Sequence, residues 1–189
     1  MAKINENLLV KGARGNVGKQ YVYKKRGKNT HIAKMPAINK NLVPTAKQME
    51  IREFFAAASL YAKGAMSSAE LKKEYEKKAV NGKTPFNIAF RDYLKTPVVK
   101  SINTEKYDGT AGSVIVVIAR DDFRVAEVKV SIRDAAAVLI EEGNAILNPI
   151  DRNKWSYTTV QANASPAGCT VSAAALDLPG NKGMLEVTV

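Results

Sequence analysis

The chain has 189 residues, of which 46% are hydrophobic, and it carries a net charge of +11. This length suffices for one domain or two small ones, since compact domains commonly hold about 100–150 residues. Its one cysteine, Cys169, excludes a disulfide within the chain, and no stretch resembles a membrane span of ~20 apolar residues or the ~7–15-residue apolar core of a secretory signal. We therefore expect a protein that is made in a cytosol and binds no membrane.

The net positive charge comes from the first half of the sequence. Residues 1–95 hold 20 Lys and Arg against 7 Asp and Glu, a net +13, whereas residues 96–189 hold 9 against 11, a net −2. Such an asymmetry indicates parts with different surfaces. We predict an α+β chain with a basic β-hairpin arm and linker over 1–44, three short helices over 45–95 and a β-sandwich over 96–189.

Residues 17–35 alternate in the manner of strands. The segments VGKQYVYKK (17–25) and NTHIAKM (29–35) flank RGK, where Gly27 can supply the positive φ of a turn, so a β-hairpin is predicted. Residues 36–44 are predicted to be an extended linker, because Pro36 and Pro44 each disfavour helix at the preceding residue.

Capping residues mark three helices. Thr45 with Gln48 and Ser67 with Glu70 have the capping-box spacing, and Thr84 before Pro85 is typical of a third helix start. Asn81-Gly82 is predicted to end the second helix. The apolar spacing predicts a buried stripe on the first helix, made of Met49, Phe54, Phe55, Ala58 and Tyr61 or Ala62.

From Thr96 onward the apolar period changes to two. Seven strands are predicted, separated by Gly, Asp, Asn and Pro: VVKSINT, GSVIVVIAR, VAEVKVSIR, AVLIEEG, WSYTTV, CTVSAAAL and GMLEVTV. Seven short strands within ~95 residues are what an antiparallel β-sandwich requires.

This second half resembles the immunoglobulin-like modules of bacterial surface and phage proteins. An Asp-rich turn before a V-x-x-V-x-V strand and a D-x-x-G-N turn before the last strand carry the resemblance, through Asp121, Asp122, Val125, Val128, Val130, Trp155, Tyr157, Asp177, Gly180 and Asn181. It implies a seven-stranded antiparallel immunoglobulin-like sandwich and specifies no ligand. The first half is similar to short uncharacterised proteins of Bacteroidota and their phages.

The glycines of GARGNVGK do not form a phosphate-binding loop. A Walker A motif requires G-x-x-x-x-G-K-[ST], but Gln20 follows Lys19, and Ala13 stands where the first glycine should be. Gly12, Gly15 and Gly18 also miss the dinucleotide-binding spacing.

The basic arm is the candidate binding surface. Its lysines and arginines could neutralise nucleic-acid phosphates while its tyrosines stack on bases, or they could dock on an acidic protein surface, or they could be merely solvated. The candidate residues are Lys11, Arg14, Lys19, Tyr21, Tyr23, Lys24, Lys25, Arg26, Lys28 and Lys34.

No catalytic residues, cofactor or metal site are predicted. His31, the only histidine, lies among lysines, and one histidine with one cysteine makes a thiol–imidazole pair or a histidine-rich zinc site improbable. Asp121, Asp122 and Asp177 could meet at one end of the sandwich and bind calcium, although paired carboxylates in such loops usually form turns.

The expected function is a non-enzymatic structural or binding protein. Modules of this immunoglobulin-like type work outside the cell, yet neither an export signal nor a disulfide is predicted. Phage virion proteins reconcile these features, because they are made in the host cytoplasm and act after lysis. The first hypothesis is an auxiliary or decoration protein that docks on a capsid or tail lattice. The alternative is a cytoplasmic nucleic-acid-binding protein.

Overall fold

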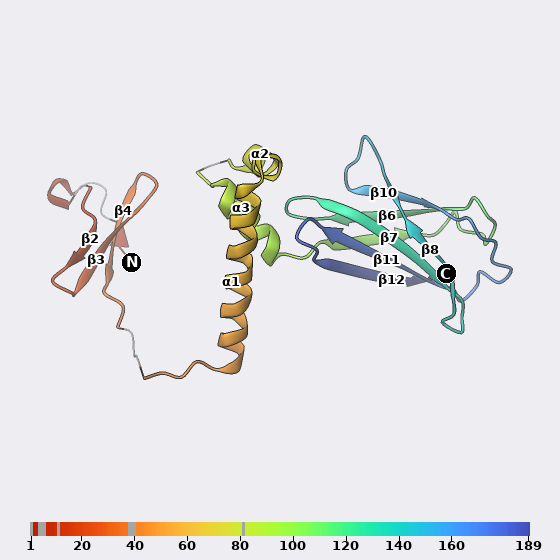
Figure 1. The fold of residues 1–189 in the computed structure, drawn as a ribbon, viewed down its shortest axis with the longest axis horizontal. Coiled ribbons are helices and arrows are strands. Elements are labelled where there is room, and N and C mark those ends of the chain that lie inside the picture. The colour runs from red at the N-terminus through yellow and green to blue at the C-terminus, as the bar shows by residue number, and fades with distance from the viewer. Residues whose placement is uncertain (1, 4–6, 11, 38–40, 81) are drawn as a thin grey trace. The chain divides into compact units, whose positions relative to one another are not determined.

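The computed structural model describes residues 2–3, 7–10, 12–37, 41–80 and 82–189. The chain divides into two compact units, residues 1–50 and 51–189. The first unit holds one antiparallel sheet and the first turn of the first helix. The second unit holds the rest of the helices and two further antiparallel sheets (Figure 1). The α+β class is therefore confirmed. The predicted boundaries at 44/45 and 95/96 divide the chain more finely and stay predictions.

The first unit is built on the predicted hairpin, which is confirmed. β3 (Tyr21–Arg26) pairs antiparallel with β4 (Asn29–Lys34), and Gly27 turns between them at φ +58°. β2 (Gly15–Val17) and β1 (Ala2–Lys3) widen it to a sheet of order β1-β4-β3-β2, and a 3-10 turn, η1, covers Leu8–Val10.

The single strand predicted over residues 17–25 is wrong. Gly18 and Lys19 both have positive φ, so the chain turns there and separates β2 from β3. Of the predicted linker over 36–44, residues 38–40 lie outside the described part of the chain.

The helices are α1 (Ala46–Ser67), α2 (Ala69–Lys78) and α3 (Pro85–Leu94). The Thr45 capping box is confirmed, because Gln48 N donates to Thr45 Oγ1 at 3.3 Å and Thr45 N donates to Gln48 Oε1 at 3.1 Å. Thr84 caps α3 as predicted. The second box is wrong: Ser67 ends α1, and Ser68 caps α2 by accepting from Leu71 N. The predicted helix end at Asn81-Gly82 is wrong as well, since the C-cap is Ala79 and Asn81 itself lies outside the described residues.

The predicted apolar stripe on α1 is only half buried. Ala58 and Ala62 are buried, but Met49, Phe54 and Phe55 are 45, 47 and 58% exposed. α1 has 22 residues, whereas α2 and α3 have ten each. α3 does reach the two phenylalanines, because the ring centroids of Phe54 and Tyr93 are 5.6 Å apart and those of Phe55 and Phe90 are 4.6 Å apart, yet this one-sided contact leaves both rings about half exposed.

All seven predicted strands of the second half are present. They are β5 (Val98–Asn103), β6 (Val114–Arg120), β7 (Val125–Arg133), β8 (Leu139–Asn144), β10 (Lys154–Thr158), β11 (Thr170–Asp177) and β12 (Lys182–Thr188). A further two-residue strand, β9 (Ile146–Leu147), was not predicted. The strands form two antiparallel sheets of order β5-β6-β10-β9 and β12-β11-β7-β8.

The two sheets enclose one hydrophobic core in a β-sandwich-like architecture. Alternate side chains of β6 and β7, such as Val117 and Val130, are fully buried, and they pack with Trp155, Tyr157 and Val171 of β10 and β11. The alternation follows from the two-residue period of a strand with one buried face. Among the described residues, no helix is long and apolar enough to cross a membrane.

One glycine shows how closely the segment after α3 lies on the sandwich. Gly183 of β12 lies under the Pro97 carbonyl, where a Cβ atom would overlap the carbonyl oxygen. By contrast, a Cβ atom at Gly64 within α1 would meet nothing within 4 Å.

We expect Gly183→Ala to destabilise the protein by about 2 kcal/mol or more, because the Pro97 backbone must move to admit the methyl group. Gly64→Ala is the control and should instead stabilise it by about 1 kcal/mol through helix propensity. Chemical unfolding of both variants measures the two effects. Equal stability of Gly183→Ala and the unmodified protein would contradict the packing described.

Candidate docking surface

The structure distributes the predicted binding residues over the whole first unit. Lys11 lies outside the described residues, and the others follow the strands and turns of the sheet. Arg14 precedes β2, Lys19 lies in the β2–β3 turn, Tyr21, Tyr23, Lys24, Lys25 and Arg26 belong to β3, Lys28 lies in the β3–β4 turn, and Lys34 ends β4.

Four of these residues lie together on one face, which we name the Tyr–Lys face. Tyr21, Tyr23 and Lys25 alternate along β3 and so share a side of the sheet. Lys34 joins them because it is directly opposite Tyr21 in the antiparallel register. Tyr21 is 49% exposed, and both lysines are exposed. The face therefore presents aromatic rings between positive charges.

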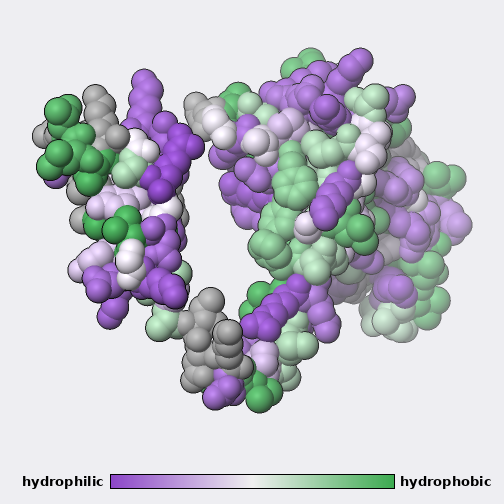
Figure 2. Space-filling view, turned by 60° about the vertical axis from the view of Figure 1, so that its left-hand side comes forward, coloured by the Kyte–Doolittle hydropathy of each residue, from purple (hydrophilic) through white to green (hydrophobic). Residues whose placement is uncertain are grey.

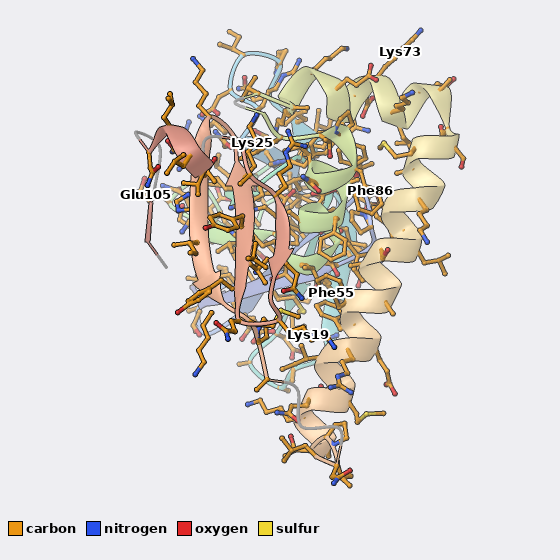
Figure 3. All side chains as sticks on the ribbon, turned by 90° about the vertical axis from the view of Figure 1, so that its left-hand side faces the viewer. Lys19, Lys25, Phe55, Lys73, Phe86 and Glu105 are labelled. Carbon is orange, nitrogen blue, oxygen red and sulfur yellow. The ribbon has the colours of Figure 1, made fainter. Side chains whose placement is uncertain are left out.

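The described candidates do not all share this face. Lys24 lies on the opposite side of the sheet, across from His31 in the register. Lys19 and Lys25 lie at opposite ends of β3 (Figure 3), and Lys28 lies in the hairpin turn. The nine candidates that the structure describes are thus not a single patch.

The charge of the first unit is not neutralised internally. Residues 1–50 hold 11 Lys and Arg against 2 Asp and Glu, and the surface that the unit shows in Figure 2 is mostly hydrophilic with separate hydrophobic patches. Within the part of the chain that the structure describes, the Tyr–Lys face lysines form no ion pair. An external anion is the partner that such a surface favours.

The carboxylates considered for calcium have other partners. Asp122 pairs with Arg91 Nε at 2.8 Å and with Lys95 Nζ at 3.0 Å. Asp177 accepts from Asn181 N at 2.6 Å and from Asn181 Nδ2 at 2.8 Å. Among the described residues, no group of three or more His, Cys, Asp or Glu side chains is placed to hold a metal ion.

A buried polar cluster between the helices and the sandwich was missed by the sequence analysis. The Tyr61 and Tyr75 hydroxyls are 2.9 Å apart, and Tyr75 donates to Asp92 Oδ2 at 2.7 Å. Asp92 is 1% exposed, and its Oδ1 atom, like Asp121 Oδ1, is buried without a hydrogen-bond partner. We name Tyr61, Tyr75, Asp92, Asp121, Asp177 and Asn181 the joint cluster. The signal that could have found it is Asp92 itself, a carboxylate four residues from Ile88 in an apolar helix.

Burial above all, together with the nearby carboxylates of Asp121 and Asp177, raises the pKa of Asp92 to about 7, although the Tyr75 hydrogen bond opposes the shift. The pKa of Asp177 is also raised, first by burial, although its bonds to Asn181 oppose this. Asp92 therefore holds a proton up to neutral pH. The neutral carboxyl group avoids the cost of burying a negative charge in the joint cluster.

Asn181 connects the last turn of α3 to the sandwich by hydrogen bonds. Its Nδ2 atom lies 3.1 Å from the Tyr93 carbonyl oxygen and 3.4 Å from that of Lys95, in addition to its contact with Asp177. These are backbone acceptors that a helix leaves free at its C-terminus. The turn at 177–181 thus positions α3 as well as connecting β11 to β12.

Comparison with known proteins gives only partial similarities to solved structures, and two of these are as follows. No protein-family model and no curated protein matches the chain. CopC from Methylosinus trichosporium OB3b is 19% identical over 49% of this chain and 92% of its own, with a TM-score of 0.35. A tetra-tandem repeat from the extending region of a large adhesion protein is 20% identical over 50% of this chain and 23% of its own, with a TM-score of 0.34. Similarities at this level carry no argument about ligand or activity.

The joint cluster predicts a pH-dependent stability. Between pH 4 and 7 the folded protein keeps the Asp92 proton while the unfolded chain, with an ordinary aspartate pKa near 3.9, has lost it. The free energy of unfolding should therefore fall as pH rises through this range, by at most about 4 kcal/mol. Asp92→Asn keeps the neutral state at every pH and should remove the Asp92 contribution, leaving only the part of the slope that comes from the raised pKa of Asp177.

Unfolding by urea at several pH values measures the effect. Glu127→Gln is the control, since it removes an exposed carboxylate of β7 and should leave the slope intact. Parallel pH profiles for Asp92→Asn and the unmodified protein would show that Asp92 does not hold the proton.

Proposed function

We propose that the protein is a non-enzymatic component of a phage particle, an auxiliary or decoration protein of the capsid or tail. It docks through the Tyr–Lys face on an acidic protein surface and displays the sandwich. The observation that carries this proposal is the first unit itself, a separate basic sheet whose Lys25 and Lys34 flank exposed aromatic surface and form no ion pair among the residues that the structure describes.

The physical argument rests on complementarity and repetition. Unpaired lysines accelerate encounter with an acidic surface and reject basic ones. Tyrosines beside them supply apolar contact area at low conformational cost. A capsid or tail repeats the same acidic surface many times, so neighbouring contacts between copies would multiply a modest affinity per copy.

For the displayed part we propose an immunoglobulin-like module. The order β5-β6-β10-β9 corresponds to strands A-B-E-D of that fold, and β12-β11-β7 corresponds to G-F-C, with β8 added beside C. The strand order thus supports the resemblance seen in the sequence. Such a module is compatible with exposure after lysis, and we expect the protein in virions after synthesis in the host cytoplasm.

The docking proposal predicts that particles purified from host cells carrying the gene contain the protein. Lys25→Glu with Lys34→Glu should reduce its copies per particle at least about tenfold, because two attractive pairs become repulsive. Lys106→Glu with Lys182→Glu, which reverses two exposed charges of the sandwich, is the control and should leave the copy number unchanged. Quantitative mass spectrometry of purified particles measures the copy number. Absence of the protein from the particles would contradict the proposal.

A second candidate, nucleic-acid binding, is favoured by one observation. Tyr21 and Tyr23 share their face with Lys25 and Lys34, and this combination of rings and cations is what binds single strands by stacking and phosphate contact.

A salt titration separates the two candidates. Nucleic-acid binding predicts tight association with single-stranded DNA that weakens steeply with salt and is lost in Tyr21→Ala with Tyr23→Ala. Docking on protein predicts weak DNA binding that the tyrosine substitutions leave unchanged. Fluorescence anisotropy of a labelled oligonucleotide distinguishes these outcomes.

A further inference from the structure

A groove of about 810 Å³ lies in the second unit, outside the surfaces described so far. Its walls are α2, the turn between β6 and β7, and the loop between β9 and β10. We infer that this groove binds an extended acidic segment of a partner protein, as a second site that does not depend on the N-terminal sheet.

The groove has an apolar interior. Phe123 and Val125 line it at the start of β7, Leu147 and Pro149 line it at the end of β9, and Trp155 of β10 lies behind them. Trp155 is 5% exposed, and its Nε1 atom is buried without a hydrogen-bond partner. Aliphatic side chains of a ligand would find apolar contacts here.

The rim of the groove is positive. Lys78 donates to the Phe123 carbonyl and lies over its ring at 4.8 Å, and Arg124 pairs with Glu74 at 3.3 Å, so these two cations are already engaged. Lys77 and Arg152 are exposed and form no ion pair within the described residues. Two carboxylates, Glu74 and Asp121, line the groove as well, and Arg124 already pairs with Glu74. The four cations of the lining outnumber these two carboxylates, which favours a ligand with carboxylates.

A strand edge borders the same groove. β9 is the last strand of its sheet and pairs only with β10, through two residues. Ile146 is 76% exposed, and no strand of the described residues covers the outer edge of β9. An extended peptide can add to such an edge by backbone hydrogen bonds while its alternate side chains enter the groove.

These features together select a peptide. The groove offers a sugar ring no stacking surface at Trp155, because this indole is only 5% exposed. A peptide that alternates acidic and aliphatic residues would instead place carboxylates near Lys77 and Arg152 and aliphatic groups near Leu147.

Trp155 makes the proposal testable because it is the only tryptophan of the chain. Its emission in the full-length protein should change saturably on addition of a synthetic eight-residue peptide of alternating glutamate and leucine. A peptide with lysine in place of glutamate should produce no such change.

Charge reversal at the rim supplies the matched comparison. Lys77→Glu with Arg152→Glu should weaken the acidic peptide at least about tenfold, whereas Lys106→Glu with Lys182→Glu, away from the groove, should not change its affinity. Amide hydrogen exchange adds a readout that needs no variant, since strand addition should slow exchange within residues 146–147.

Three results would overturn the inference. One is unchanged Trp155 emission and unchanged exchange at 146–147 with millimolar acidic peptide. Another is equal binding of the lysine peptide. The last is a response to polygalacturonate in place of the peptide, which would assign the groove to a polysaccharide. The particle-binding experiment uses other residues, so failure here leaves the docking proposal standing.

Discussion

The arrangement of the second unit depends on the contact between α3 and the turn that joins β11 to β12. Asn181 donates to free carbonyl oxygens at the end of α3, and the raised pKa of Asp92 allows this carboxyl group to be buried there in its neutral form. This contact fixes the helices to one end of the sandwich. α2 lies beside the β6–β7 turn through its own contacts, because Lys78 donates to the Phe123 carbonyl and Glu74 pairs with Arg124, and α2 forms one wall of the groove.

The first unit differs from the second in size, exposure and charge. Its sheet is small, its side chains are largely exposed, and its net charge is strongly positive, whereas the sandwich is close to neutral and has a continuous core. On our proposal the sandwich supplies a rigid displayed body, while the basic sheet supplies attachment to a repeating acidic surface.

Local signals in the sequence predicted local structure well. Thr45 and Thr84 mark helix starts through their own side-chain bonds, and the two-residue period identified every long strand of the sandwich. Phe54 and Phe55 were assigned to a buried stripe, yet they lie half exposed because only α3 covers them, through Tyr93 and Phe90. Asp92 and the groove depend on segments far apart in sequence, namely α2, α3 and three loops of the sandwich, which no local pattern brings together.

The central claim is that the basic sheet, and not the sandwich, touches the particle. Zero-length carbodiimide cross-linking of purified particles tests it most directly, because this chemistry joins only lysines and carboxylates already in contact. Mass spectrometry of the digested particles should find Lys25 and Lys34 joined to Asp or Glu residues of a particle protein. Cross-links to that protein from Lys106 or Lys182 alone, with Lys25 and Lys34 unmodified, would contradict the account.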